Sequence, residues 1–191
     1  MKRKTLSIAL VCLLGAATVQ SAQAQAKMAM VNVMVGGQAM MPSKDIVANA
    51  VNSADHTTLV AAVKAAGLVE TLQGKGPFTV FAPVNDAFEN LPAGTVETLV
   101  KSENKAQLTK VLTYHVVAGN MTADKIMAAV KAGKGTASFK TVSGGTLKAT
   151  MNGPKNVVLM DESGNTATIS TYDVMQSNGV IHVIDKVMLP K

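Results

Sequence analysis

Apolar residues in the first half of the chain recur at the spacing of amphipathic helices. In residues 55–69 the side chains of Leu59, Val63 and Ala66 fall on one face, and Asp55 is a candidate N-cap for this helix. The same period predicts further helices at residues 45–51, 85–88, 95–100, 105–113 and 122–133, with extended segments at residues 78–82 and 114–117.

The second half of the chain changes to the pattern of short strands. Turn residues such as Ser143-Gly144-Gly145 and Asn152-Gly153-Pro154 separate runs that are rich in Val, Thr and Leu. The predicted strands cover residues 138–142, 146–151, 156–160, 166–171 and 179–189. Helices followed by hairpins favour an α+β domain over an alternating parallel-sheet fold, and we expect one such domain at residues 43–191.

The first 24 residues have the order of a cleaved signal peptide. The basic residues Lys2, Arg3 and Lys4 precede an apolar run at residues 6–17, and the small-residue stretch SAQAQA follows at residues 21–26. Cleavage is predicted after Ala24, with cleavage after Ala26 as the alternative. The protein is therefore expected to be exported, to the periplasm, the cell surface or the medium, and no later segment is predicted to span a membrane.

The single cysteine, Cys12, lies inside the apolar run of this peptide. It is either an apolar filler that is removed with the peptide or the anchor of a lipoprotein. Val11 stands where a lipoprotein requires a small residue, which favours removal. The exported protein then has no cysteine, so its stability is expected to come from the core without a disulfide.

Residues 25–42 form a methionine-rich leader that is interrupted by glycine. It is either a flexible segment or a strand at residues 30–35 that packs on the domain. Thioether sulfur is a suitable ligand for Cu(I), whereas methionine is also an adaptable packing residue. The leader thus allows a copper site as an alternative to plain packing, and its methionines are Met28, Met30, Met34, Met40 and Met41.

Charge and composition argue against nucleic-acid binding. The formal charge of the 191 residues is +6, but without the three basic residues of the signal peptide 15 basic residues face 12 acidic ones. The remaining lysines are scattered, and no basic run is interleaved with aromatic residues. With 48% hydrophobic and only 3% aromatic residues, the core is expected to consist mainly of small aliphatic side chains and methionine.

The sequence contains no recognisable catalytic or metal-binding motif. Its three histidines, His56, His115 and His182, are far apart and have no partner at metal-ligand spacing. Hydrolase and dinucleotide motifs are missing as well. We expect no enzyme activity and no cofactor, and we assign no catalytic residue.

Three blocks of the sequence resemble the conserved blocks of the fasciclin domain family. The first is FTVFAPVNDAF at residues 78–88, the second is Tyr114-His115, and the third is NGVIHVID at residues 178–185, which a Leu-Pro pair follows at residues 189–190. Their order and spacing agree with the family from about residue 45 to 190. The residues that carry the first and third blocks are Phe78, Phe81, Pro83, Asn85, Asp86, Phe88, Asn178, Gly179, His182 and Asp185.

This resemblance implies a wedge-shaped β-sandwich with a layer of short helices and a non-enzymatic role in cell adhesion. The implied partner is a protein or a polysaccharide at the cell envelope or extracellular matrix, and the protein is expected to be a monomer. One residue departs from the family pattern. Val84 stands where a threonine usually caps the following helix, so Asn85 or Asp86 is expected to take over the cap.

Two interpretations of the polar motif residues remain open. Tyr114 and His115 either belong to a partner-binding surface or support the sandwich through buried hydrogen bonds, and the second interpretation is favoured. His182 and Asp185 are expected to form a polar pair that holds the fold. The alternative function is a periplasmic carrier of an apolar small molecule or of Cu(I).

Overall fold

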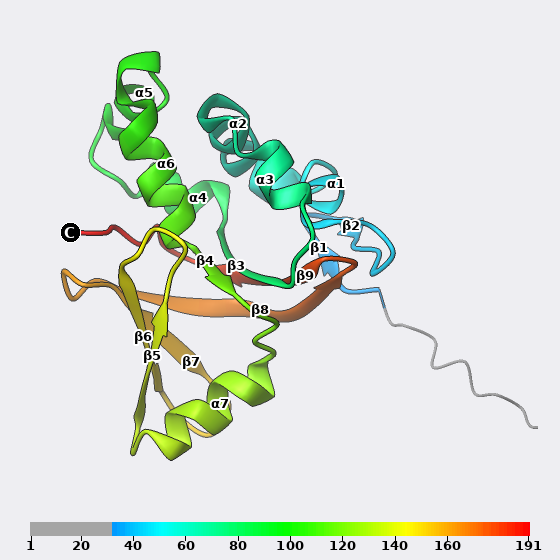
Figure 1. Cartoon of the computed structure of the whole chain (residues 1–191), viewed down its shortest axis with the longest axis vertical. Coiled ribbons are helices and arrows are strands. Elements are labelled where there is room, and N and C mark those ends of the chain that lie inside the picture. Colours follow the sequence, from blue (N-terminus) through cyan, green and yellow to red (C-terminus); the bar gives the residue numbers. More distant parts are fainter. Residues whose placement is uncertain (1–31) are drawn as a thin grey trace, which may run out of the picture. The chain divides into compact units, whose positions relative to one another are not determined.

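The structure is a computed structural model that describes residues 32–191. The predicted signal peptide, Cys12, Met28 and Met30 lie outside the described residues. Helices α1 to α6 gather on one side of strands β3 and β9, and α7 lies beside β5 and β6 (Figure 1). The α+β class expected from the sequence is therefore confirmed.

Helices occupy most of the chain between residues 46 and 132. The α-helices are α1 (Ile46–Ala50), α2 (Thr57–Ala66), α3 (Val69–Gln73), α4 (Asn85–Glu89), α5 (Thr95–Leu99), α6 (Lys105–Tyr114) and α7 (Ala123–Ala132). Two short 3₁₀ helices, η1 (Ala54–His56) and η2 (Ser102–Asn104), precede α2 and α6. Gly67 ends α2 in the left-handed conformation at φ 72°.

Seven strands form one mixed sheet in the order β4-β3-β9-β8-β7-β6-β5. Only β3 and β9 are parallel, and every other neighbouring pair is antiparallel. The strands are β3 (Phe78–Pro83), β4 (Val116–Ala118), β5 (Thr136–Lys140), β6 (Thr146–Met151), β7 (Val157–Met160), β8 (Thr166–Gln176) and β9 (Gly179–Ile184).

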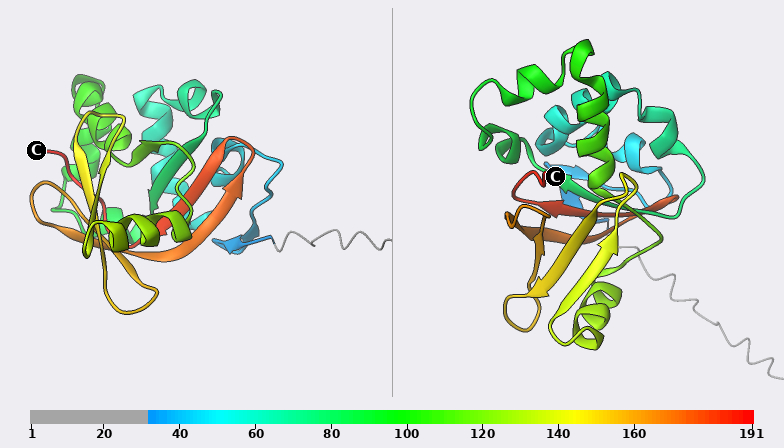
Figure 2. Two further views of the ribbon diagram at one scale, coloured as in Figure 1. Left: turned by 60° about the horizontal axis from the view of Figure 1, so that its bottom comes forward. Right: turned by 60° about the vertical axis from the view of Figure 1, so that its left-hand side comes forward.

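Strand β8 joins the two halves of this sheet. Its first residues pair with β7 and its remainder pairs with β9, and the register shifts twice between Ile169 and Val174. Bulges of this kind bend a strand, and Figure 2 shows β8 curving between its two partners. A bridge between Val117 and Thr141 brings the two end strands together, so the sheet is nearly closed.

The domain has two hydrophobic cores that share strand β3. Val80 and Ala82 face the core under the helices, whereas Phe81 faces the core inside the curved half of the sheet, with Leu147 and Leu159. Alternate residues of a strand point to opposite faces, so both faces of β3 are covered. This explains why four of the five residues 78–82 are apolar and do not alternate with polar ones.

Part of the methionine-rich leader is a hairpin of β1 (Met34–Val35) and β2 (Gln38–Ala39). Val35 and Met40 are buried in the helix-side core, whereas Met34 and Met41 are exposed. The turn requires glycine, because Gly36 has φ 58° and a Cβ there would lie 2.6 Å from the backbone nitrogen of Asp55.

Several element boundaries differ from the sequence prediction. Tyr114 is the last residue of α6 and not part of an extended segment, because the helix continues to the buried His115. The final strand ends at Ile184 and not at Leu189, since the chain leaves the sheet there and the Met188 N–H bonds to His115 instead. Strand β8 in contrast runs five residues further than predicted, to Gln176, because pairing with β9 extends it.

The predicted caps are also different in the structure. Asp55 lies in η1, and His56 takes the N-cap position of α2 without a side-chain bond. The side chain of Asn85 does not cap its own helix, where Val84 holds the N-cap position. It caps α2 instead: Asn85 Oδ1 accepts from the Thr58 N–H at 3.0 Å, and its Nδ2 donates to the Ala54 carbonyl at 2.8 Å.

We expect Asn85→Ala to lower the free energy of unfolding by about 1–2 kcal/mol, because α2 loses its cap and the Ala54 carbonyl loses a donor. Asp86→Ala is the matched control, since Asp86 is the exposed neighbour in the same helical turn. Urea unfolding of both variants checks the prediction. An equal effect of the two substitutions would contradict the role of Asn85 as the cap of α2.

Candidate functional site

The first and third sequence blocks meet as neighbouring strands. Strands β3 and β9 pair in parallel, with Phe81 opposite His182 and Pro83 opposite Ile184. The rings of Phe81 and His182 stack with centroids 5.6 Å apart and an interplanar angle of 25°. Both side chains are almost completely buried. The pairing therefore places two distant sequence blocks side by side in the centre of the domain.

His115 connects the second block to this centre. Its carbonyl oxygen accepts from the Phe81 N–H at 2.9 Å. Its Nδ1 donates to the Val111 carbonyl at 2.8 Å, and its Nε2 accepts from the Met188 N–H at 3.0 Å. Because one ring nitrogen donates and the other accepts, the geometry fits a neutral imidazole. Burial lowers the pKa of His115 to about 4, which agrees with that state.

Tyr114 points into the other core and is also fully bonded. Its hydroxyl donates to the Thr146 carbonyl at 2.7 Å and accepts from the Glu162 N–H at 3.2 Å. Burial raises the pKa of Tyr114 to about 12, so the phenol stays protonated at neutral pH. Tyr114 thus joins the turn after β7 to the start of β6.

His182 and Asp185 do not form the polar pair that the sequence suggested. The His182 Nε2 donates to the Met121 carbonyl at 2.8 Å, and its Nδ1 faces the Asp173 N–H at 3.4 Å. Burial lowers the pKa of His182 as well. The carboxylate of Asp185 accepts from the Thr168 N–H at 2.7 Å. His182 lies on β9 and Asp185 lies just beyond its end, three positions later, and no hydrogen bond joins their side chains.

Asn178, at the start of the third block, connects two helices to the sheet through hydrogen bonds. Asn178 accepts from the Ile46 N–H at 3.1 Å and donates to the Leu72 carbonyl at 2.7 Å, which connects the start of β9 to α1 and α3. Gly179 is required by space, because a Cβ there would lie 2.0 Å from the Phe78 carbonyl oxygen.

The other residues of the first block are placed by β3 and α4. Phe78 is half-buried at the start of β3, Pro83 is buried at its end, and Phe88 is buried in the helix-side core. Asp86 is exposed. The polar residues of the three blocks therefore bond to several different parts of the domain and do not gather around one open cleft.

Metal ligands do not cluster in the part of the chain that the structure describes. Residues 32–191 contain no group of three or more His, Cys, Asp or Glu side chains that could hold a metal ion. Of the leader methionines described, Met34 and Met41 reach solvent, while Met40 is buried.

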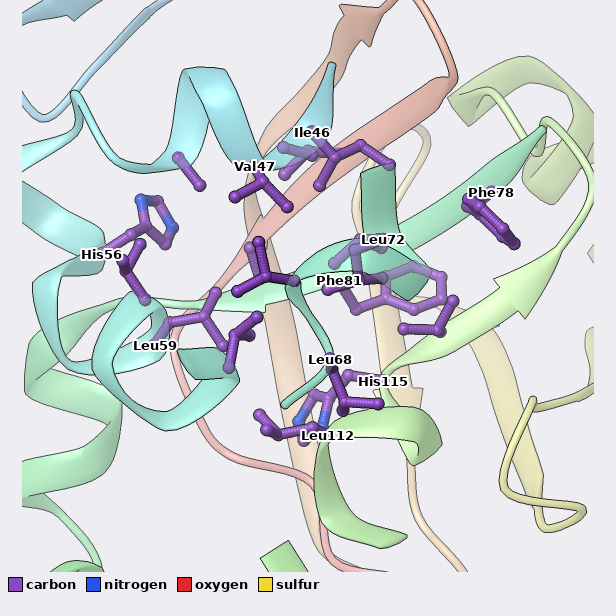
Figure 3. Close-up of a pocket in the computed structure, with 18 of the residues that line it drawn as sticks. Ile46, Val47, His56, Leu59, Leu68, Leu72, Phe78, Phe81, Leu112 and His115 are labelled. Carbon is purple, nitrogen blue, oxygen red and sulfur yellow. The ribbon is translucent and has the colours of Figure 1, made fainter. Parts of the chain in front are cut away.

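An apolar cavity, which the sequence did not predict, lies between the helices and the sheet. It has a volume of about 70 Å³, and its walls come from α1, α2, α3, α6 and the central strands (Figure 3). His56 lies on one side of it and Leu112 on another. The sequence gives no signal for a cavity, because its walls come from segments that are far apart in the chain.

Comparison with known proteins decides the family. The model of the fasciclin domain matches residues 54–190. This chain belongs to the fasciclin domain family. Protein sll1483 of Synechocystis sp. is 50% identical to it over 146 residues, which are 76% of this chain and 73% of that protein. The immunogenic protein MPB70 of Mycobacterium bovis is 35% identical over 154 residues, 78% of this chain and 70% of the relative.

A solved structure supports the same fold. It contains a pair of FAS1 domains from the insect cell adhesion molecule fasciclin I, and it aligns with a TM-score of 0.67 at 16% identity. The match covers 76% of this chain and 51% of the other. The fasciclin assignment made from the three sequence blocks is thus confirmed, and the blocks correspond to β3 with α4, the end of α6, and β9.

We expect the stability of this fasciclin domain to fall as the pH is lowered from 7 to 5. The pKa of His115 is about 4 in the folded state, below its ordinary value of 6.5, so the unfolded chain takes up the proton first. The stability that His115 contributes is complete above pH 6.5 and is lost towards pH 4. From pH 7 to pH 5 this loss is about 2 kcal/mol for His115 alone.

Urea unfolding at pH 7, 6 and 5 measures this effect, and this interval leaves most carboxylates ionised. Burial lowers the pKa of His56 and His182 too, so both add a loss of the same sign. A free energy of unfolding that stays constant over the interval would show that the histidines are not held neutral.

We also expect His115→Ala and His182→Ala to lower the melting temperature, because each leaves buried backbone groups without a partner. The expected cost is on the order of 1–3 kcal/mol for the lost hydrogen bonds, and the space left by the ring adds to it. Lys131→Ala on the exposed face of α7 is the control, with a change within about 0.5 kcal/mol. An unchanged melting curve together with lost partner binding would instead assign these histidines to a recognition surface.

Proposed function

We propose that the chain is an exported, non-enzymatic adhesion module that contacts a protein or a polysaccharide at the cell surface or in the matrix. The observation that carries this proposal is the burial of the polar motif residues. Tyr114 and His182 are 0% exposed and His115 is 3% exposed, and their polar atoms bond to the backbone of the same domain. The motif residues thus support the fold and leave the exterior for recognition.

The chemistry of these residues argues against catalysis. Burial holds the histidines neutral and the Tyr114 phenol protonated, and both ring nitrogens of His115 are already used. A general base needs a free lone pair within reach of a substrate, which these residues do not offer. Recognition by surface complementarity requires no such group.

The family relationship and the sequence support the same proposal. The fold resembles that of about half of a chain that contains a FAS1 domain pair from an insect cell adhesion molecule. The basic and apolar N-terminus predicts export, and no helix within residues 32–191 has the length and apolar character to cross a membrane. Export and a folded domain whose motif residues are used inside the fold agree with the needs of an adhesion module.

A second candidate function is the carriage of an apolar small molecule. The cavity under the helices favours it, because its walls are almost entirely apolar and it lies inside the folded domain. Binding of a small molecule there does not compete with adhesion through the exterior. The two functions can therefore be tested on the same protein.

The adhesion proposal predicts that the immobilised protein retains a component of the cell envelope or of the matrix. An extract of the cell envelope or of the matrix is passed over the folded protein and over the same protein denatured by heat. The amount of retained material is then compared. Prior digestion of the extract with a protease or with glycosidases identifies the partner as a protein or a polysaccharide. Retention that is equal on folded and denatured protein would refute specific recognition.

A further inference from the structure

The cavity under the helices contains one buried polar atom without a hydrogen-bond partner. This atom is Nε2 of His56, a residue that is only 3% exposed. The other ring nitrogen, Nδ1, is 2.9 Å from the Ser53 hydroxyl. His56 lies at the end of η1, and Figure 3 shows its ring beside Val47 and Leu59 of the cavity wall. His56 thus places a ring nitrogen without a hydrogen-bond partner at the wall of an apolar cavity.

The surroundings favour Nε2 as the nitrogen that carries the hydrogen. The Ala82 carbonyl interacts favourably with the protonated ring but lies outside hydrogen-bond geometry. The Ser53 hydroxyl donates to Nδ1 in the matching tautomer. Burial lowers the pKa of His56, so the ring is neutral at pH 7. His56 therefore presents one N–H donor.

The other polar residues of the cavity wall are already bonded or lie at the surface. Both nitrogens of His115 have partners, and the Thr113 hydroxyl donates to the Thr109 carbonyl at 2.6 Å. A buried water needs two to four polar partners, and this cavity offers only one free group. An unpaired buried donor is costly, so an acceptor that reaches it gains a full hydrogen bond.

We propose that the cavity binds the oxygen-bearing end of a neutral apolar molecule, whose carbonyl or hydroxyl oxygen accepts from the Nε2–H of His56. This inference rests on the second candidate function and names its ligand class. The volume of 70 Å³ is about half of the roughly 150 Å³ that accommodates benzene, so it fits a short, narrow chain. The remainder of a longer molecule would extend out of the cavity towards solvent, next to the exposed wall residues Lys64, Thr71 and Val142.

Two probes of nearly equal shape test the role of the oxygen. Hexan-2-one carries a carbonyl, and 2-methylhex-1-ene replaces that oxygen with a CH₂ group. Titration followed by the ring signals of His56 in NMR gives the affinity for each probe. We expect the wild-type protein to bind the ketone about tenfold more tightly than the alkene, the effect of one hydrogen bond.

Substitutions locate this preference. His56→Phe keeps a ring but removes the donor, so the ketone preference is expected to vanish while the alkene still binds, as read from methyl signals of the cavity wall. His56→Gln retains an N–H donor and is expected to keep part of the preference. Val47→Phe fills the cavity and is expected to abolish binding of both probes. Val100→Ala, exposed and outside the cavity, is the matched control with both affinities unchanged.

The outcomes separate this inference from the function on which it rests. If the wild type binds neither probe, the carrier function and the inference both fail. If it binds both probes equally, or if folded His56→Phe keeps the ketone preference, the cavity is a site for apolar molecules but His56 does not select an oxygen. Thermal unfolding of every variant shows whether it is folded.

Discussion

The parallel pairing of β3 with β9 is the contact on which the rest of this structure depends. It joins segments about 100 residues apart in register from Phe78–Gly179 to Pro83–Ile184. Both strands have cores on their two faces, so their backbone groups can be satisfied only by each other and by the neighbouring strands. Gly179 allows the close approach at which this pairing begins, because any side chain there would collide with Phe78.

Buried polar residues extend this pairing into the remaining elements. His115 bonds to the helix that precedes it and to the segment that follows β9, while its carbonyl bonds to β3. Asn178 connects the start of β9 to α1 and α3. Apart from the bond of His115 to Val111 in its own helix, each of these groups bonds to backbone atoms of a distant segment. Burial of a polar group stabilises a unique fold when its hydrogen bonds are satisfied in this way. The same saturation leaves neither ring nitrogen of His115 free to act as a base.

The cavity supports the proposed carriage of a small molecule, which is separate from the proposed adhesion through the exterior. The sheet and the helices have to enclose two cores with mainly small aliphatic side chains, and the space under the helices is not completely filled. His56 differs from His115 and His182 because one of its nitrogens has no partner. An adhesion module needs neither the cavity nor this free donor, so both features support the proposed carriage of a small molecule and not the proposed adhesion.

The sequence by itself determined the family, the α+β class and the approximate positions of the helices and hairpins. These properties depend on local periodicity, on turn residues and on three short blocks, each of which is continuous in the sequence. It also indicated that Tyr114 and His115 are more suited to support the fold than to bind a partner, and their burial agrees with that interpretation.

Only the tertiary structure decided which groups meet. Asn85 caps α2 and not its own helix, Asp185 binds β8 and not His182, and His56 faces a cavity whose walls come from four helices and the sheet. Local sequence patterns do not predict these contacts, because the hydrogen bonds and the cavity depend on how distant segments pack. The sequence specifies what each segment can form, and the long-range pairing of β3 with β9 determines which of those possibilities come into contact.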